Sequence, residues 1–166
     1  MGHFKTELKN VKGFAFDVDG VFSNSHVYLH PSGDMMRSMN IKDGYAIMRA
    51  VKEGFPVAII TGGNSESVRT RFHGLGITDV YLKTFEKKDA FEDFRFKYGL
   101  EPEDVLYMGD DIPDYEVMQY VGLPTCPADA CEEIKTVSKY ISHKEGGDGC
   151  VRDVVEQVLR AQGKWL

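Results

Sequence analysis

Asp17 and Asp19, two carboxylates one residue apart, come directly after an apolar run and are followed by Gly20. The run, Val11 to Phe16, has the composition of a buried strand. A strand that ends in Asp-x-Asp-Gly can place one carboxylate on each side of a reaction centre, and the glycine lets the backbone approach an anion or a metal closely. When it stands alone, such a pattern is more often a solvated turn after an edge strand than a catalytic site.

Three later segments favour catalysis, because each brings polar or charged groups to the expected carboxyl end of a strand. That edge of an open parallel sheet is where ligands bind. The segments are Thr61-Gly62-Gly63 after the apolar run 57–60, Lys87 at the start of a helix, and the acids Asp110, Asp111 and Asp114 after the run 105–108. Any one of them is weak evidence, but the four motifs in this order predict a catalytic site.

With these motifs the chain resembles the haloacid dehalogenase-like phosphohydrolases, whose motifs are Asp-x-Asp, a Ser or Thr, a Lys and a terminal acidic cluster. Longer stretches are similar to one family within them, the 3-deoxy-D-manno-octulosonate (KDO) 8-phosphate phosphatases. These stretches are Asn40–Tyr45, Ala58–Gly62, Gly109–Asp111, Gly146–Arg152 and Ala161–Lys164. The resemblance departs at Gly63, where the enterobacterial-type members carry an arginine.

The resemblance implies that Asp17 is a nucleophile that forms an aspartyl-phosphate, and that Asp19 protonates the ester oxygen and then activates water. Asp17, the backbone carbonyl of Asp19, and Asp110 would supply hard oxygen ligands for Mg²⁺. Asp111 and Asp114 would orient waters and the site lysine. An acid at the start of a helix also interacts favourably with the helix dipole, which is a simpler explanation for Asp114.

The groups expected around the phosphate are a hydroxyl, two amides and a lysine. Thr61 offers the hydroxyl, and the amides of Gly62 and Gly63 can approach a phosphate without a Cβ in the way. A strand end followed by a glycine turn explains the same residues without a ligand. Lys87 matches the family lysine better than Lys88, by its spacing to the Asp-Ala-Phe that follows, although either can be a solvated charge at a helix start.

Three arginines are candidates for binding the rest of the substrate. Arg71 matches a basic position of the resembling family, and Arg69 precedes it on the same predicted helix. Arg152 lies in the first turn of the last predicted helix, where a cation opposes the helix dipole and therefore suggests a specific task. A guanidinium suits the carboxylate of a sugar acid, but each of these arginines also fits a polar surface.

The composition of the 166 residues narrows the class of protein. We expect one hydrolase domain over residues 1–166, because a chain of this length forms a single core. The net charge of −6 argues against a nucleic-acid partner, and no apolar run is long enough to span a membrane, so we expect a cytoplasmic protein. Three cysteines without C-x-x-C spacing favour neither disulfides nor a zinc site.

Strand-like and helix-like segments alternate along the chain and predict an α/β fold, a Rossmann-like parallel sheet with helices on both faces. Strands are expected at 11–17, 57–61, 79–82, 105–108 and about 122–126. Helices are expected at 44–53, 65–75, 87–98, 115–121, 130–137 and 151–161.

Residues 27–40 interrupt this alternation and predict a β-hairpin flap beside the site. The hairpin is too short to be a cap domain, and no large insertion follows Thr61. A site without a cap needs a lid from elsewhere to exclude water, so we expect a homo-oligomer, most simply a tetramer. Apolar residues that fit an interface are Met35, Met36, Met39 and the pair Trp165-Leu166, although the methionines fit a core equally well.

The predicted function is therefore an Mg²⁺-dependent phosphomonoesterase acting on a small acidic sugar phosphate. The resemblance implies conversion of KDO 8-phosphate to KDO and phosphate, a step toward lipopolysaccharide precursors. The alternative enzyme acts on a nine-carbon keto-deoxy sugar acid 9-phosphate, but the acid that would mark it is absent at Gly63. A receiver-type signalling domain clusters similar side chains, yet takes its phosphoacceptor from a later strand. A non-catalytic oligomerisation module is disfavoured, because all four motifs keep reactive side chains.

Overall fold

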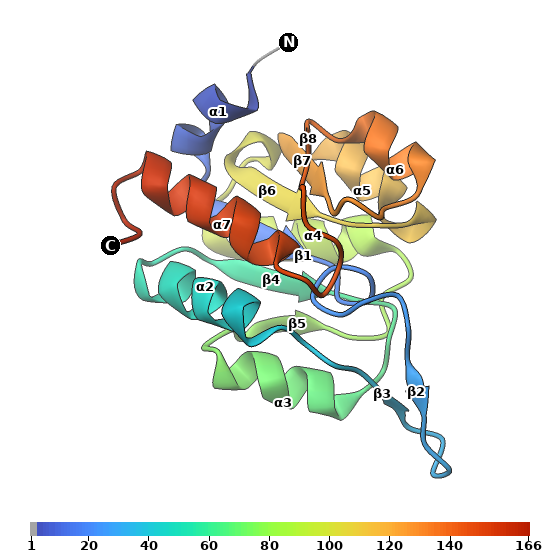
Figure 1. Ribbon diagram of the computed structural model, residues 1–166. Helices are drawn as coiled ribbons and strands as arrows, with labels where there is room; N and C mark the ends of the chain where they lie inside the picture. Colours follow the sequence, from blue (N-terminus) through green and yellow to red (C-terminus); the bar gives the residue numbers. More distant parts are fainter. Residues whose placement is uncertain (1–2) are drawn as a thin grey trace.

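A central sheet of six parallel strands forms the middle layer of the protein, whose computed structural model describes residues 3–166 (Figure 1). In spatial order the strands are β5 (Asp79–Tyr81), β4 (Val57–Ile60), β1 (Gly13–Phe16), β6 (Val105–Met108), β7 (Leu123–Cys126) and β8 (Tyr140–Ile141). Every residue of β1, β4, β6 and β7 is buried, as expected when helices cover both faces of a parallel sheet. The predicted α/β fold is confirmed.

Helices pack on both faces of this sheet. One face is covered by α2 (Ile41–Lys52), α3 (Glu66–Gly74) and α7 (Cys150–Ala161), and the other by α4 (Lys87–Tyr98), α5 (Tyr115–Tyr120) and α6 (Glu132–Val137). The alternation of side chains along β1 divides the core, with Phe14 and Phe16 on the first face and Ala15 on the second. Within residues 3–166, no helix combines the length and apolarity needed to cross a bilayer.

The path of the chain creates a crevice at the carboxyl ends of β1 and β6. From β1 the chain adds β4 and β5 on one side, and then β6, β7 and β8 on the other. Open α/β sheets bind ligands where the strand order reverses in this way. Because Phe16 of β1 pairs with Met108 of β6, the residues that follow each strand emerge next to one another.

Several predicted elements have shifted ends, and a few short ones were not predicted. The helix predicted at 44–53 begins earlier, at Ile41, because the side chain of Asn40 accepts a hydrogen bond from the Lys42 amide and caps it. The strand β8 and the N-terminal helix α1 (Phe4–Glu7) were missed, since segments this short show no hydrophobic periodicity. Single 3₁₀ turns at Leu8–Asn10, Pro102–Asp104 and Ile112–Asp114 were missed for the same reason.

The predicted hairpin is present as β2 (Tyr28–Leu29) and β3 (Met35–Met36), which pair antiparallel and project from the site edge of the sheet (Figure 1). The strand residues of this flap are exposed, whereas Met39 at its base packs against the core. The methionines therefore divide between surface and core. The described residues contain no cap domain, as predicted.

The C-terminal tail does not offer its tryptophan to a neighbour, contrary to expectation. Trp165 is only 4% exposed, because it packs edge-on against Tyr45 of α2 with ring centroids 5.9 Å apart. The preceding carbonyl, of Lys164, accepts hydrogen bonds from Arg49 of α2. Leu166 alone remains exposed. The apolar tail is thus mostly part of the subunit's own core.

A buried carboxyl group, that of Asp43 in the first turn of α2, caps α7 from a different helix. Its Oδ1 accepts a hydrogen bond from the Arg152 amide at 2.8 Å, and its Oδ2 has no partner among the described residues. Burial raises the pKa of Asp43 to about 6, against the opposing effect of hydrogen bonds from the Arg152 and Gly149 amides. The carboxylate of Asp148 raises it further, and the thiol of Cys150 also lies nearby.

We expect Asp43 to make the stability of the fold depend on pH. Its folded pKa of about 6 lies above the unfolded value of about 4. The contribution of Asp43 to the free energy of unfolding is therefore full below pH 4 and declines as pH rises through 6. Asp43→Asn keeps an oxygen for the Arg152 amide but cannot ionise. Urea unfolding should show the wild type losing about 2 kcal/mol relative to Asp43→Asn between about pH 4.5 and 7.5. A difference that stays constant across this range would contradict the assignment.

Candidate active site

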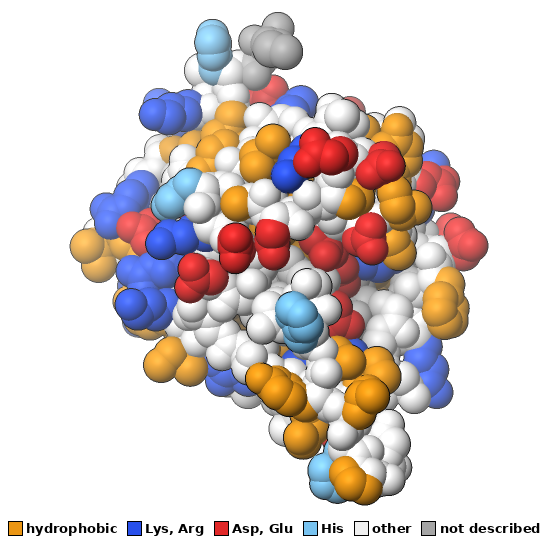
Figure 2. Space-filling model, turned by 45° about the vertical axis from the view of Figure 1, so that its right-hand side comes forward, with side chains coloured by type: hydrophobic (Ala, Val, Ile, Leu, Met, Phe, Trp, Pro, Cys, Tyr) orange, Lys and Arg blue, Asp and Glu red, His pale blue; other side chains and the backbone are white. Residues whose placement is uncertain are grey.

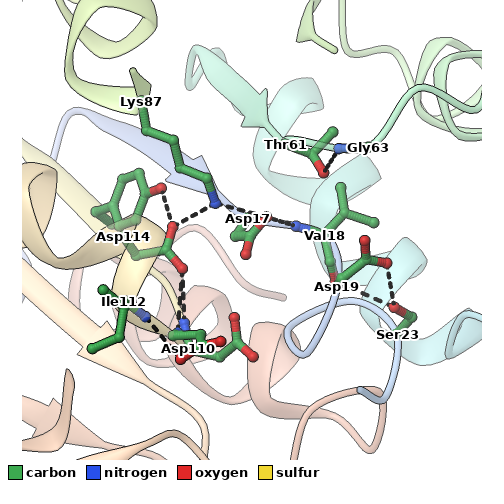
Figure 3. Close-up of polar contacts among 12 residues, drawn as sticks. Asp17, Val18, Asp19, Ser23, Thr61, Gly63, Lys87, Asp110, Ile112 and Asp114 are labelled. Carbon is green, nitrogen blue, oxygen red and sulfur yellow. Dashed lines mark hydrogen bonds and ion pairs between the residues drawn. The ribbon is translucent and has the colours of Figure 1, made fainter. Parts of the chain in front are cut away.

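Three acidic side chains meet in the crevice between β1 and β6 (Figure 3). One carboxylate oxygen from each of Asp17, Asp110 and Asp114 lies within 4.8 Å of the others. Gly20 makes this approach possible, since its φ is +80° and a Cβ there would lie 1.8 Å from Oδ2 of Asp110. The glycine of the Asp-x-Asp-Gly motif is therefore required for space as well as for the turn.

Lys87, the first residue of α4, is the cation that faces these acids. Its Nζ lies 3.0 Å from Oδ1 of Asp17 and donates to Oδ1 of Asp114 at 2.7 Å. The Tyr107 hydroxyl donates to the same Asp114 oxygen at 2.7 Å, and the Asp110 amide donates to the other at 3.0 Å. Asp114 is fully buried with both oxygens engaged, so it positions the lysine and the Asp110 loop rather than serving a helix dipole at the surface.

The crevice holds more buried negative than positive charge. Burial raises the pKa of Asp17 well above its usual range, repulsion from Asp114 adds to this, and Lys87 opposes it. Burial and Asp114 likewise raise the pKa of Asp110 to about 7. For Lys87, burial lowers the pKa, but attraction to Asp17 and Asp114 outweighs it and raises the pKa overall. A divalent cation among these oxygens would relieve their repulsion.

Asp19 lies on the outer side of Asp17 and faces a different set of partners. Its side chain is 39% exposed, and its Oδ1 is 3.4 Å from the Ser23 hydroxyl. Arg37 of the flap donates to both of its oxygens, from Nε to Oδ1 at 2.5 Å and from Nη2 to Oδ2 at 3.0 Å. This outward position suits a group that reaches the leaving oxygen of a substrate.

A pocket of about 690 Å³ joins the motif residues. Thr61 is buried at the end of β4, and its hydroxyl accepts a hydrogen bond from the Gly63 amide at 3.2 Å. The residues lining the pocket include Asp17, Asp19, Arg37, Thr61, Gly62, Gly63, Lys87, Asp110 and Asp111, with Met35, Phe85 and Ile112 at its apolar edge. Figure 2 shows acidic side chains gathered across this edge of the molecule and apolar side chains on the flap below.

The glycine loop before α7 packs directly on the Asp-x-Asp-Gly turn. A Cβ on Gly146 would lie 2.0 Å from the Gly20 carbonyl oxygen, and the Gly147 amide donates to the Val21 carbonyl at 2.9 Å. The Cys150 thiol donates to the same carbonyl at 3.2 Å. These glycines allow two backbones to touch, so the loop supports the catalytic turn rather than acting as a flexible connection.

Several predicted substrate-binding residues lie outside the pocket of this subunit. Arg69 donates to a carbonyl of β5, and Arg71 lines an adjoining hollow with Arg37. Arg152 pairs with Glu156 on the same helix. The described subunit thus does not place these three arginines, which were expected to bind the sugar acid beyond the phosphate, in the pocket.

Of the two candidate lysines, Lys87 and not Lys88 reaches the acids. Lys88 is partly exposed, lies 3.6 Å from Glu116, and sits over the ring of Tyr120 on the outer surface. The two lysines differ because successive residues of a helix point to different sides, so Lys87 of α4 faces the crevice and Lys88 faces the outer surface.

Sequence reasoning missed two polar residues of the site, Arg37 and Tyr107. Arg37 is the single Lys or Arg between residues 27 and 40, and a lone cation on a flap beside an acidic motif is a usable signal. Tyr107 was read as part of an apolar strand. Its place three residues before Asp110, where a hydroxyl can reach the acids, is a signal that the sequence offers.

Comparison with known proteins agrees with this fold. The model of the haloacid dehalogenase-like hydrolase family matches residues 64–152, and the chain belongs to this class of enzymes. Its curated relatives include the 3-deoxy-D-manno-octulosonate 8-phosphate phosphatase of Salmonella typhi, 39% identical over 98% of this chain and 86% of that protein. The chain belongs to this phosphatase family and is a phosphoric monoester hydrolase. The receiver-type alternative is thereby set aside.

Solved structures of similar proteins support the same membership. The phosphatase of Moraxella catarrhalis, in complex with a magnesium ion, a phosphate ion and KDO, is 33% identical with a TM-score of 0.94. That match covers 99% of this chain and 95% of the other. The cobalt-bound phosphatase of Haemophilus influenzae is 30% identical, with a TM-score of 0.92 and coverage of 96% and 93%.

Proposed function

We propose that this protein hydrolyses KDO 8-phosphate to KDO and inorganic phosphate. The main support is the convergence of Asp17, Asp19, Thr61 and Lys87 on one pocket, in a chain whose relative from Moraxella catarrhalis binds magnesium, phosphate and KDO. We place the reaction in the cytoplasm, because the cysteines of the chain are free thiols, as is typical of a reducing compartment.

In the proposed reaction, Asp17 attacks phosphorus, and the bond between phosphorus and the sugar oxygen breaks as Asp19 gives that oxygen a proton. Asp19 then takes a proton from a water molecule, which attacks phosphorus and releases Asp17 and phosphate. The Thr61 hydroxyl and the amides of Gly62 and Gly63 hold the phosphoryl oxygens, and Lys87 neutralises their charge.

The acidic residues fit a hard divalent cation, and we propose Mg²⁺. Asp17 and Asp110 offer carboxylate oxygens, and the Asp19 carbonyl belongs to the same turn; both oxygens of Asp114 are already engaged by protein groups. The two carboxylates and the Asp19 carbonyl are oxygen ligands of the type that Mg²⁺ prefers. When bound, the ion would offset the repulsion between an anionic nucleophile and a phosphate dianion.

We expect Mg²⁺ to stabilise the folded protein as well as to support turnover. Because the crevice concentrates buried carboxylates, saturating Mg²⁺ should raise Tm by about 4 °C or more over a sample in EDTA. Asp110→Asn should largely abolish this rise, while Asp104→Asn, which removes an acid on the opposite edge of the sheet, should keep it. A Tm that is insensitive to Mg²⁺ in the wild type would contradict the proposed metal site.

The proposed substrate is tested by measuring phosphate release from a panel of sugar phosphates. The panel should contain KDO 8-phosphate, a nine-carbon keto-deoxy sugar acid 9-phosphate, arabinose 5-phosphate and glucose 6-phosphate. We expect the highest kcat/KM for KDO 8-phosphate. A higher kcat/KM for the nine-carbon acid would make that acid the substrate in place of KDO 8-phosphate. A higher kcat/KM for a sugar phosphate without a carboxylate would overturn the proposal.

We also propose that the protein is a homotetramer whose subunits cover one another's pockets. The strands of the flap are exposed, with Tyr28 64% and Leu29 79% exposed, and Ile41 at the start of α2 is 79% exposed. Large apolar side chains with this much exposure favour an interface with a second copy. Size-exclusion chromatography with light scattering should show a tetramer, and Leu29→Asp should shift it toward smaller species. A fully active monomer would refute the proposal.

A further inference from the structure

The flap carries a buried guanidinium on an otherwise exposed hairpin. Met35 and Met36 of β3 are each 44% exposed, yet the side chain of the next residue, Arg37, is only 4% exposed. It turns into the pocket and donates to both oxygens of Asp19, while its Nη1 donates to the Met35 carbonyl at 2.5 Å. Every nitrogen of the guanidinium is therefore engaged, and its position is defined rather than free.

The pocket has little other positive charge for a substrate to meet. Among the described residues that line it, the lysines and arginines are Lys87 and Arg37 alone. Lys87 lies at the inner end between Asp17 and Asp114, where the phosphoryl group reacts. A second anionic group on the substrate consequently has Arg37 as its partner within the subunit.

Arg37 also lies on the leaving-group side of the site. Asp17 and Lys87 define the position of phosphorus, and Asp19, which protonates the leaving oxygen, lies between them and the guanidinium. The sugar must leave the phosphate in this direction. A guanidinium that binds a carboxylate through two parallel hydrogen bonds can exchange one carboxylate for another of the same geometry.

The absence of a side chain at Gly63 keeps room for this arginine. A Cβ at Gly63 would lie 3.0 Å from Nη2 of Arg37, closer than an undisturbed contact. The φ of Gly63 is not positive, so alanine can adopt its backbone conformation and would act by pressing on the guanidinium. Position 63 and the flap arginine are thus sterically coupled across the pocket.

From these contacts we propose that Arg37 determines specificity by binding the carboxylate of the sugar acid, releasing Asp19 as it does so. This inference rests on the proposed function, since it requires a substrate that carries a carboxylate as well as a phosphate. Substrates without the carboxylate leave the Arg37–Asp19 pair in place and gain nothing from the arginine.

The test compares one substrate that has the carboxylate with one that lacks it. For Arg37→Met, kcat/KM for KDO 8-phosphate should fall about 10- to 100-fold, mainly through KM, whereas the value for arabinose 5-phosphate should change less than about threefold. Arg37→Lys should lie between wild type and Arg37→Met, because it keeps the charge without the planar fork. Gly63→Ala, which presses on the guanidinium without removing it, should lower kcat/KM for KDO 8-phosphate less than Arg37→Met does.

Controls separate this role from a structural one. Arg160→Met removes an exposed arginine near the far end of α7, and it should leave kcat/KM unchanged for both substrates. Equal losses of kcat on both substrates in Arg37→Met and Arg37→Lys would show that the arginine positions Asp19 instead, and unchanged kinetics would show no role; either result overturns the inference. The proposed function is tested separately, by the wild type alone. It fails if the wild type does not prefer KDO 8-phosphate, whatever the variants show.

Discussion

Asp17→Asn should abolish turnover while leaving the fold intact. Asparagine has nearly the volume of aspartate, but its amide cannot form the aspartyl-phosphate on which both half-reactions depend. Loss of a covalent step should lower kcat by at least about three orders of magnitude. Steady-state phosphate release with KDO 8-phosphate, and with a simple aryl phosphate as a second substrate, measures this directly.

The stability of the same variant provides its control. Burial and neighbouring acids raise the pKa of Asp17, so a neutral side chain there should leave Tm in EDTA unchanged or higher. Asp19→Asn should also be severely impaired, yet its Asp17 should still be detectable as a phosphoryl adduct by mass spectrometry. An Asp17→Asn protein that keeps more than a few per cent of kcat, or a phosphoryl adduct on Asp19, would reverse the roles of the two residues.

Lys87→Met should damage both activity and stability. The lysine is buried between Asp17 and Asp114, and its removal leaves two carboxyl groups without their cation. Breaking a buried ion pair by deleting one partner typically costs about 3 kcal/mol or more, and loss of a cation at the phosphoryl group should lower kcat about 1000-fold. Urea unfolding in EDTA and phosphate release measure the two effects.

A double variant tells these effects apart. Lys87→Met with Asp114→Asn removes one of the unpaired acids, so it should recover at least about 1 kcal/mol of stability while remaining inactive. Lys88→Met is the matched control, because that lysine is the next residue on the same helix but faces the outer surface. If Lys87→Met kept activity within tenfold of wild type, the lysine would have no part in the reaction.

The fold and the clustering of the motif side chains in one pocket could be predicted because local signals specify them. The apolar runs before Asp17, Thr61 and Asp110 mark three strand ends. Parallel strands bring their carboxyl ends to one edge of the sheet in any strand order. The same order of motifs predicted that Lys87 and Asp114 lie beside these acids.

The sugar end of the site could not be predicted, because it depends on directions that the sequence does not encode locally. Arg69, Arg71 and Arg152 are basic residues on helices, and whether each faces the pocket is decided by how its helix packs. Arg37 reaches Asp19 because it directly follows β3, where the projecting hairpin returns to the sheet. The burial of Trp165 within the subunit could not be predicted for a similar reason, since it depends on α2 lying beside the tail.

The contact between the glycine loop and the Asp-x-Asp-Gly turn has a consequence for how the enzyme becomes active during its synthesis. The turn that carries Asp19 lies near the N-terminus, but Gly146, Gly147 and Cys150 hold it through contacts with Gly20 and Val21. A ribosome must therefore have translated the chain through Cys150 before the Asp-x-Asp-Gly turn has its support. Until α7 emerges from the exit tunnel, the nascent protein can carry all four motifs and still be silent toward phosphate esters.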